Sequence, residues 1–523
     1  MPIERKPIKL PEKPKDQEII VKEKPASQET ENELIELEES IRFFTEKTDT
    51  DGNFKDITIN YVKLINFYKS LGFARYDIEK GRSILVMIEN RVISEVSVNE
   101  ITDKVINHLG RLDYNDYERL NAEMLTNKFY KALGSYFSAD KLNRMVLDHF
   151  IEINRDSKTE AFFYYNNGYV VCTKDGWQIN EYSKLQSYLW KDQILSRNFK
   201  LIDFEKAEDY KSCGVFADFI GKVCGEDEER FKSLCSIIGY NLHAYTENKL
   251  KATILTDSKI SEVADGRTGK TLFCKSLGHM RNYTEINGKD FDPVRDQFKY
   301  QEVNIDTQIV HLNDVRQYFN IELLFNDITE GVKVNKKGLQ PFTVKLKMII
   351  STNKTIKIQG SSARDRTVEF EFSDYFSDKR SPQDEYGHWF FTDWDTEEWA
   401  RYDNFMMYCT SVFLKVGLYQ TKSINLEARK LLDQSSIEFI EFMEDLKIEF
   451  GIEYDKKALF KQFIERYPDF DTPKFKQRHF TSWLRMYAEY SEGFRPINKT
   501  EDEVRRGGAD YIIFRSKPNN PNP

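Results

Sequence analysis

The stretch Ala264-Asp-Gly-Arg-Thr-Gly-Lys-Thr271 decides the fold of this chain. It matches the phosphate-loop pattern G-x-x-x-x-G-K-[ST] at its last three residues and has alanine in place of the first glycine. Backbone N–H groups at a helix N-terminus can wrap a polyphosphate, and the small residues of such a loop allow the close approach. The residues expected on a nucleotide are Ala264, Gly266, Arg267, Thr268, Gly269, Lys270 and Thr271.

The sequence on both sides of this loop fits the same interpretation. Residues 252–256 predict a buried strand and residues 271–277 predict the helix that follows the loop. Lys270 is expected to place a positive charge on the β- and γ-phosphates, and the Thr271 hydroxyl is expected to ligate Mg²⁺. Residues 257–263 make the loop long. A glycine turn that merely precedes Lys-Thr stays an alternative.

Composition excludes several classes of protein. The chain has 523 residues, enough for several domains, and its net charge is −9, so any contact with nucleic acid must use a local basic patch. The six cysteines contain no C-x-x-C pair, which argues against a disulfide framework and a zinc ribbon. We expect a cytoplasmic protein with no membrane contact, because no signal peptide or long apolar run is present.

Two regions come before the loop, after a tail rich in Pro, Lys and Glu that is expected to be disordered. Helical spacing at 61–68 and 101–109, with a strand at 83–88, predicts an α/β accessory domain. The aromatic-rich region 160–247 predicts a small sheet followed by helices. These helices are expected at 185–190, 217–223 and 231–242. Its aromatic residues suit either a domain core or the stacking of unpaired bases.

A second apolar strand, residues 307–312, ends in Asn313-Asp314. An acidic strand end after a phosphate loop is expected to hold Mg²⁺ and to orient the attacking water. Because the first residue of this pair is an amide, we place the catalytic role on Asp314 and expect Asn313 to contact the hydrated ion. An aspartate at position 313 would restore a carboxylate there. A strand that simply ends in a polar turn is the alternative.

Three further elements follow in order. Residues 330–347 predict a hairpin that carries Lys333, Lys336 and Lys337, which are either solubilising or placed to meet a phosphate backbone. Residues 348–353 predict a third apolar strand that ends in Asn353, which could hold the attacking water or the γ-phosphate. Arg364 and Arg366 then come before an alternating strand at 367–372.

The order of these elements resembles the superfamily 3 helicases, in the branch of phage, plasmid and poxvirus primase-helicases. Over about residues 160–419 the resemblance implies an AAA+ ATPase that uses ATP and Mg²⁺, forms a homo-oligomeric, hexameric ring, and acts on single-stranded or forked DNA with a primase or polymerase as partner. It implies that Asn353 is the sensor, that Arg366, with Arg364 as second choice, is the arginine finger, and that Lys336 or Lys337 meets DNA. Asn313 and Ala264 depart from the family pattern.

The fold class expected from all this is α/β, with an AAA+-type phosphate-loop core. The domains expected are a disordered tail at 1–40, an N-terminal α/β accessory domain at 41–155, a mainly helical domain at 156–247, the ATPase/helicase domain at 248–420, and a winged-helix-like module at 430–517. That module is expected to have helices at 437–450, 456–466 and 474–490, strands near 494–497 and 511–514, and a basic face of Lys474, Lys476, Arg478 and Arg485. A solvated helix face is the alternative.

The function expected is that of an ATP-dependent DNA helicase that acts in the replication of a phage or mobile element. A loader or defence protein that binds without unwinding, and a scaffold that has lost hydrolysis, stay open as alternatives.

Overall fold

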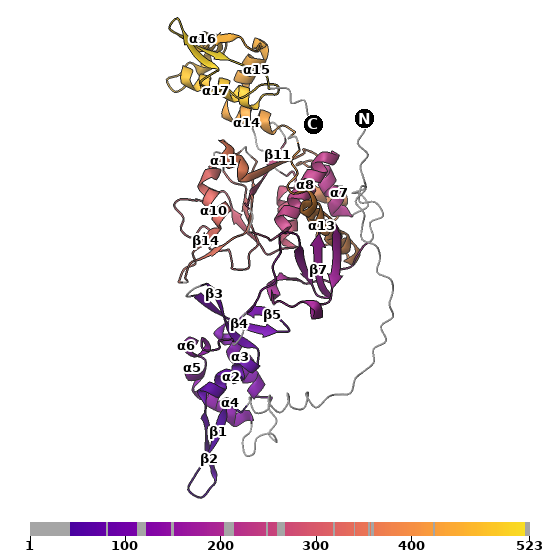
Figure 1. Cartoon of the computed structure of the whole chain (residues 1–523), viewed down its shortest axis with the longest axis vertical. Coiled ribbons are helices and arrows are strands. Elements are labelled where there is room, and N and C mark those ends of the chain that lie inside the picture. The colour runs from indigo at the N-terminus through magenta and orange to yellow at the C-terminus, as the bar shows by residue number, and fades with distance from the viewer. Residues whose placement is uncertain are drawn as a thin grey trace. The chain divides into compact units, whose positions relative to one another are not determined.

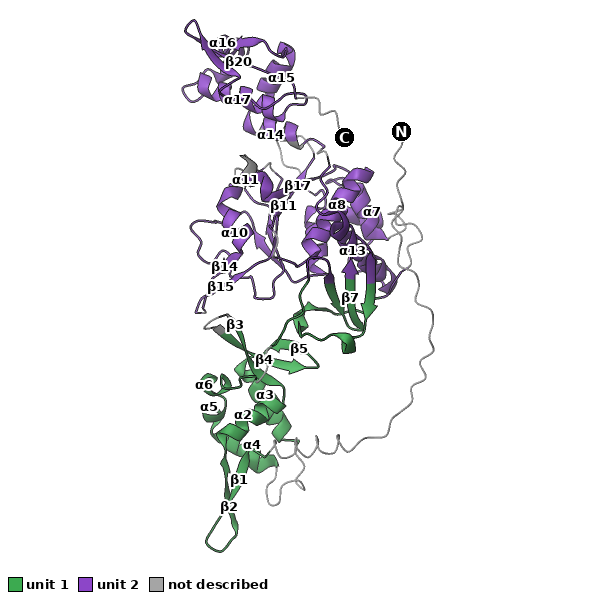
Figure 2. Ribbon diagram, in the orientation of Figure 1, with its two compact units in different colours: residues 1–156, 162–171, 178–199 green, residues 157–161, 172–177, 200–523 purple. Residues whose placement is uncertain are grey.

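The protein is described here from a computed structural model, shown in Figure 1. The structure describes residues 42–79, 82–111, 122–147, 151–202, 214–246, 249–258, 267–316, 319–338, 340–353, 356, 360–421 and 424–517. The chain divides into two compact units, which Figure 2 distinguishes by colour. The expected tail at 1–40 lies outside the described residues, and the boundaries of the five expected domains stay a prediction.

The first unit mixes short strands and helices, as the sequence predicts for its N-terminal part. The helices predicted at 61–68 and 101–109 and the strand predicted at 83–88 are confirmed by α2, α3 and β4. The sheet order is β3-β4-β5-β9, and β1 pairs with β2 in a separate hairpin. The elements are β1 (Phe44–Thr48), β2 (Phe54–Ile59), α2 (Tyr61–Ser70), β3 (Phe73–Glu79), β4 (Arg82–Glu89), β5 (Val92–Glu95), α3 (Val98–Leu109), α4 (Ala122–Lys131), α5 (Leu133–Tyr136), α6 (Ala139–Leu142) and β9 (Leu189–Trp190).

The aromatic-rich region is only partly helical. The predicted small sheet is present, with strand order β10-β6-β7-β8: β6 (Ala161–Tyr165), β7 (Gly168–Thr173), β8 (Gly176–Asn180) and β10 (Ile194–Leu195). The helix predicted at 185–190 is wrong, because this segment contains β9 and is preceded by a short 3-10 turn, Tyr182–Lys184. The mainly helical character expected for 156–247 is therefore confined to its second half, where α7 (Val215–Val223) and α8 (Glu228–Leu242) lie.

Helix α8 packs closely along α13 (Thr396–Val416), and Figure 1 shows the two side by side. At their contact, a Cβ atom placed on Gly239 would lie 2.2 Å from the backbone oxygen of Cys409. No side chain fits at that distance, so the two backbones can touch only because residue 239 is glycine.

The second unit is built on a five-stranded parallel sheet of order β12-β13-β16-β11-β17. Its strands are β11 (Ala252–Asp257), β12 (Tyr283–Asn287), β13 (Ile309–Asn313), β16 (Lys347–Ser351) and β17 (Thr367–Phe372). The inner strands are buried on both faces, which matches their continuous apolar sequences. The four strands predicted at 252–256, 307–312, 348–353 and 367–372 are confirmed. The protein is thus α/β with a parallel sheet.

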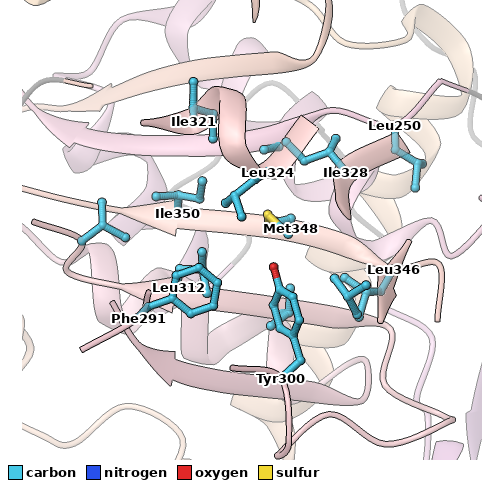
Figure 3. Packing of buried hydrophobic residues seen from close by; sticks show 14 of the residues in the cluster. Leu250, Phe291, Tyr300, Leu312, Ile321, Leu324, Ile328, Leu346, Met348 and Ile350 are labelled. Carbon is cyan, nitrogen blue, oxygen red and sulfur yellow. The ribbon is translucent and has the colours of Figure 1, made fainter. Parts of the chain in front are cut away.

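One face of this sheet carries a large apolar core. Leu312, Met348 and Ile350 of the strands pack against residues of η5 (Ile321–Leu324) and α10 (Phe325–Glu330), as Figure 3 shows. The Tyr300 hydroxyl at the border of this core donates a hydrogen bond to Asp327 at 2.9 Å. The remaining elements here are α9 (Lys270–Gly278), β14 (Val332–Val334), β15 (Phe342–Val344), α11 (Gly360–Asp365) and α12 (Pro382–Tyr386).

The C-terminal part of the second unit has a separate aromatic core that includes Phe439, Phe463 and Phe480. The three helices are confirmed, but the strand predicted near 494–497 is wrong, since the sheet there is three-stranded with order β18-β20-β19. The elements are α14 (Leu426–Gln434), α15 (Ile437–Leu446), β18 (Glu453–Asp455), α16 (Lys456–Arg466), η6 (Pro468–Phe470), α17 (Gln477–Tyr490), β19 (Glu503–Arg506) and β20 (Ala509–Ile513).

Two expectations from composition can be compared with the described residues. Five of the six cysteines lie there, and all five are buried and outside any disulfide. The sixth, Cys213, lies outside the described ranges. Within those ranges, none of the helices is both long and apolar enough to cross a membrane.

Candidate nucleotide site

The site lies at the edge of the parallel sheet where the strands end. Strand β11 ends at Asp257 and helix α9 begins at Lys270. The Lys270 ammonium forms an ion pair with the Asp257 carboxylate and donates hydrogen bonds to Asn353 Oδ1 at 2.8 Å and Thr268 Oγ1 at 3.2 Å. Because β16 is the immediate neighbour of β11, Asn353, two residues after the end of β16, reaches the start of α9. Two residues singled out from the sequence, Lys270 and Asn353, are therefore in direct contact.

The described part of the loop has the strained backbone that a phosphate loop needs. Arg267 has φ 66° and Gly269 has φ 96°, both in the left-handed region. A Cβ atom at Gly269 would lie 2.8 Å from the ring of Phe219 in α7. Both the positive φ and the lack of space beside this ring therefore require glycine at this position. Thr271 is exposed in the first turn of α9. Ala264 and Gly266 lie outside the described residues.

These two constraints make Gly269 a test of the loop. We expect Gly269→Ala to lower the free energy of unfolding by at least about 2 kcal/mol and to weaken nucleotide binding, because the start of α9 must move away from Phe219. Gly338→Ala is the matched control. It also has a positive φ, 77°, but nothing lies within 4 Å of its Cβ position, so only about 1 kcal/mol is expected. Thermal unfolding and titration with a fluorescent ATP analogue measure both effects. Equal losses in the two variants would contradict the contact with Phe219.

The two residues at the end of β13 have different surroundings. Asn313 donates from Nδ2 to Glu285 Oε1 at 2.7 Å and accepts at Oδ1 from the Ser351 hydroxyl at 3.0 Å. Asp314 follows with φ 58°, and its partly exposed carboxylate pairs with the Lys289 ammonium at 2.8 Å. This hydrogen bond raises the pKa of Lys289. Asn313 is thus locked from two sides, whereas Asp314 faces a lysine at the surface.

A chain of hydrogen bonds continues behind Asn313 into the sheet. His311, which is fully buried, contacts the Tyr283 hydroxyl through Nδ1 at 2.6 Å and the Ser351 hydroxyl through Nε2 at 2.8 Å. Burial lowers the pKa of His311 to about 3, so its imidazole is neutral near pH 7. The Asp314 backbone N–H also donates to the Ser351 hydroxyl, at 3.2 Å. The network joins β12, β13 and β16.

The donors at this edge fit a Mg²⁺ ion that is shared with phosphates. The described residues contain no group of three His, Cys, Asp or Glu side chains that could hold a metal ion. Mg²⁺ normally keeps several waters and binds one or two carboxylates together with substrate phosphates. The Thr271 hydroxyl and the side-chain oxygens of Asn313 and Asp314 are hard oxygen ligands of the kind it prefers. Together with bound phosphates they would suffice.

The two arginines lie at the opposite edge of the sheet. Arg366 comes just before β17, whose first residue, Thr367, pairs with Ala252 at the start of β11. Lys270 lies beyond the far end of β11, so roughly 16 Å of strand separates the two edges at about 3.3 Å per residue. Arg366 donates to the Ser362 hydroxyl at 2.7 Å and covers the Phe325 ring.

Arg364 is more exposed than Arg366. Its guanidinium pairs with Glu489 of α17 at 3.3 Å, and its side chain is 65% exposed. Within one subunit, neither arginine is placed at the end of the sheet where Lys270 lies.

The lysine hairpin is confirmed by antiparallel pairing of β14 with β15. Lys333 is exposed on β14 and Lys337 is exposed at the turn before Gly338. Lys336 is partly buried, and its ammonium donates to the side chain of Asn304. Two of the three expected DNA contacts therefore point to solvent, while the third has a partner within the protein.

No protein-family model and no curated protein matches this chain. Solved structures do show similarity to this chain, at low sequence identity. The apo structure of the C-terminal region of NrS-1 aligns over 87% of this chain and 99% of its own length, with 12% identity and a TM-score of 0.39. The JCV helicase, in complex with a small molecule, aligns over 46% of this chain and 65% of its own length, with 12% identity and a TM-score of 0.23.

Several residues of this site belong to no recognisable sequence motif. Asp257 could have been found from the sequence, since it is an acidic residue at the end of the strand before the loop. Glu285, His311 and Ser351 could not, because their contacts depend on which strands become neighbours and in which register. Lys289 lies in a polar stretch with no distinguishing pattern.

Proposed function

We propose that this chain is an ATP-dependent DNA helicase of the superfamily 3 type, a ring-forming AAA+ motor that moves on single-stranded DNA during replication of a phage or mobile element. The observation that carries the proposal is the contact of Lys270 with Asn353 at the end of the sheet, with Asn313 and Asp314 on the next strand. Strand β16 lies between β11 and β13, so the lysine, the sensor and the metal-binding end follow one another along one edge.

The residues at this edge can divide the work of ATP hydrolysis. Lys270 leaves Asp257 to meet the β- and γ-phosphates, and the backbone N–H groups at the start of α9 hold the phosphate oxygens. Asn353, which already contacts Lys270, lies where it can orient the γ-phosphate or the attacking water. Bound Mg²⁺ would neutralise charge on the phosphates. Arg366, at the far edge of the sheet, supports a ring, because it could reach only a nucleotide held by a neighbouring subunit.

The C-terminal elements support a winged-helix-like module. Their order, α15-β18-α16-α17-β19-β20, places two hairpin strands after the third helix, as in a wing. Lys474, Lys476 and Arg478 are exposed. Arg485, however, donates to Glu503 at 2.6 and 2.9 Å, so it does not belong to the free basic face. Burial of Glu503 opposes ionisation, but hydrogen bonds from Arg485 and Lys456 outweigh it and lower its pKa to about 2.

The lysine hairpin provides the test of DNA-driven turnover. We expect single-stranded DNA to stimulate ATP hydrolysis by the wild-type protein, and the variant with Lys336→Ala and Lys337→Ala to keep basal turnover but lose the stimulation. The slope of log affinity against log salt should fall by about 1.4, or about 0.7 for each lysine that meets a phosphate of a single strand. Phosphate release and fluorescence anisotropy measure these two effects.

A matched pair of exposed lysines serves as the control. Lys174→Ala with Lys191→Ala removes the same charge from residues that do not belong to the hairpin and should change neither quantity. Strand displacement on a forked substrate then separates a helicase from a loader or defence switch. Two results would contradict the proposed role of the hairpin: ATP turnover of the wild-type protein that DNA does not stimulate, or DNA stimulation that is still present in the hairpin variant.

A further inference from the structure

The end of β13 lacks a carboxylate at position 313, but a carboxylate lies one hydrogen bond away. Glu285, in the neighbouring strand β12, accepts from Asn313 Nδ2 at 2.7 Å. Residue 285 pairs with His311, two residues before Asn313, so the side chains of Glu285 and Asn313 extend from the same face of the sheet. Tyr283, two residues before Glu285 and on the same face, lies against α9, where a Cβ atom on Gly278 would be 3.3 Å from the Tyr283 side chain. Glu285 is therefore on the side of the sheet that carries the phosphate-binding helix.

The hydrogen-bond chain behind Asn313 runs in one direction. The Ser351 hydroxyl donates to Asn313 Oδ1, so it accepts from His311 Nε2, and His311 Nδ1 accepts from the Tyr283 hydroxyl. The Asn313 amide is thereby oriented with its oxygen towards Ser351 and its nitrogen towards Glu285. An amide nitrogen can only donate, so the group it faces must be a hydrogen-bond acceptor, and here that acceptor is the Glu285 carboxylate.

We propose that Glu285 supplies the carboxylate missing at position 313 and accepts the proton of the water that attacks the γ-phosphate. Asn313 is then a positioning residue that holds Glu285 towards the nucleotide and is itself held by Ser351, which His311 contacts. This assignment rests on the proposed ATPase function and deepens it. Asp314 is less suited to the task, because its partly exposed carboxylate already pairs with Lys289.

The chemical step balances without a further reactant. The water oxygen forms a bond to the γ-phosphorus while the bond from that phosphorus to the oxygen bridging to the β-phosphate breaks. The electron pair of the broken bond stays on ADP. The proton lost by the water passes to Glu285, which releases it after inorganic phosphate has formed.

Substitutions of Glu285 and Asn313, alone and together, test this assignment. Glu285→Gln should lower kcat by about 10²-fold or more with KM nearly unchanged, because a positioned general base is worth about 10²–10⁴ in rate. A fluorescent ATP analogue should bind this variant within threefold of wild type, with Mg²⁺ and with EDTA, and thermal unfolding should be unchanged. Asp290→Asn removes a 79% exposed carboxylate nearby and should leave kcat unaltered.

Position 313 is tested in the same experiment. From the sequence alone, Asn313→Asp should preserve or raise turnover, but its contact with Glu285 reverses that expectation, since two carboxylates would then face each other. Asn313→Glu should likewise lower turnover, and Glu285→Asn should nearly abolish it. The variant that carries Asn313→Glu and Glu285→Asn together should recover at least tenfold over Glu285→Asn, because it restores one carboxylate and one amide.

The outcomes separate this assignment from the proposed function. Turnover in Glu285→Gln above half of wild type, or no recovery in the folded exchange variant, overturns the role of Glu285 while the ATPase stands. If wild-type protein and Lys270→Ala release phosphate equally slowly, the ATPase function itself fails, whatever the Glu285 variants do.

Discussion

Lys270→Ala is expected to abolish ATP hydrolysis and also to destabilise the protein. The first effect follows from the loss of the charge on the β- and γ-phosphates. The second follows from the structure: Lys270 is only 7% exposed and neutralises Asp257, which is 6% exposed, so the variant leaves a buried carboxylate without its cation. Breaking one partner of such a pair costs about 3 kcal/mol.

A second substitution separates the two effects. Asp257→Asn removes the carboxylate that Lys270→Ala leaves unpaired. The variant with Lys270→Ala and Asp257→Asn should therefore regain at least half of the lost stability and none of the activity. Thermal unfolding and phosphate release give the two readings. Hydrolysis by Lys270→Ala would contradict the phosphate-binding role, and unchanged stability would contradict the ion pair.

Arg366→Ala is expected to bind ATP almost normally and to hydrolyse it more slowly by a factor on the order of 10³–10⁵, the range for arginine fingers. The reason is its location at the opposite edge of the sheet from Lys270, from which it can complete only a neighbour's site. Mixing Arg366→Ala subunits with Lys270→Ala subunits should then restore some turnover, because an interface with an intact loop and an intact finger can form.

Arg364→Ala is the control for the loss of a nearby positive charge. Its guanidinium is more exposed and pairs with Glu489, so we expect a change of less than tenfold in turnover. Phosphate release from mixtures of known ratio, in rings shown to contain both subunits, is the measurement. If no activity returns on mixing, Arg366 supports its own subunit, for instance by holding α11 through Ser362.

Most of the central sheet could be predicted from the sequence, because β11, β13 and β16 are largely apolar runs bounded by polar residues and β17 alternates. The contact of Lys270 with Asn353 follows once β16 is known to lie beside β11. The hydrogen bond of Asn313 with Glu285 could not be foreseen. The strand Tyr283–Asn287 carries no acidic end and no apolar run. In addition, the sequence of a parallel strand does not identify which strand lies beside it in the sheet.

The errors elsewhere also have local causes. Residues 185–190 have apolar spacing that suits either a helix turn or a short strand, and pairing of Leu189 with Val92 decides for the strand. Near the C-terminus, Phe494 and Ile497 suggested a strand, but Pro496 between them cannot donate to a ladder. The hairpin of β19 and β20 instead turns at two glycines with positive φ, Gly507 and Gly508.

The contact between α8 and α13 limits how this sequence can change over evolutionary time. Because a Cβ atom at position 239 would collide with the backbone of Cys409, no amino acid other than glycine is compatible with this helix crossing. We therefore expect glycine at the equivalent of position 239 in every homologue that keeps the crossing, however far the surrounding sequence diverges. The glycine at position 338 has open space around it and should drift freely to asparagine or aspartate, which tolerate a positive φ.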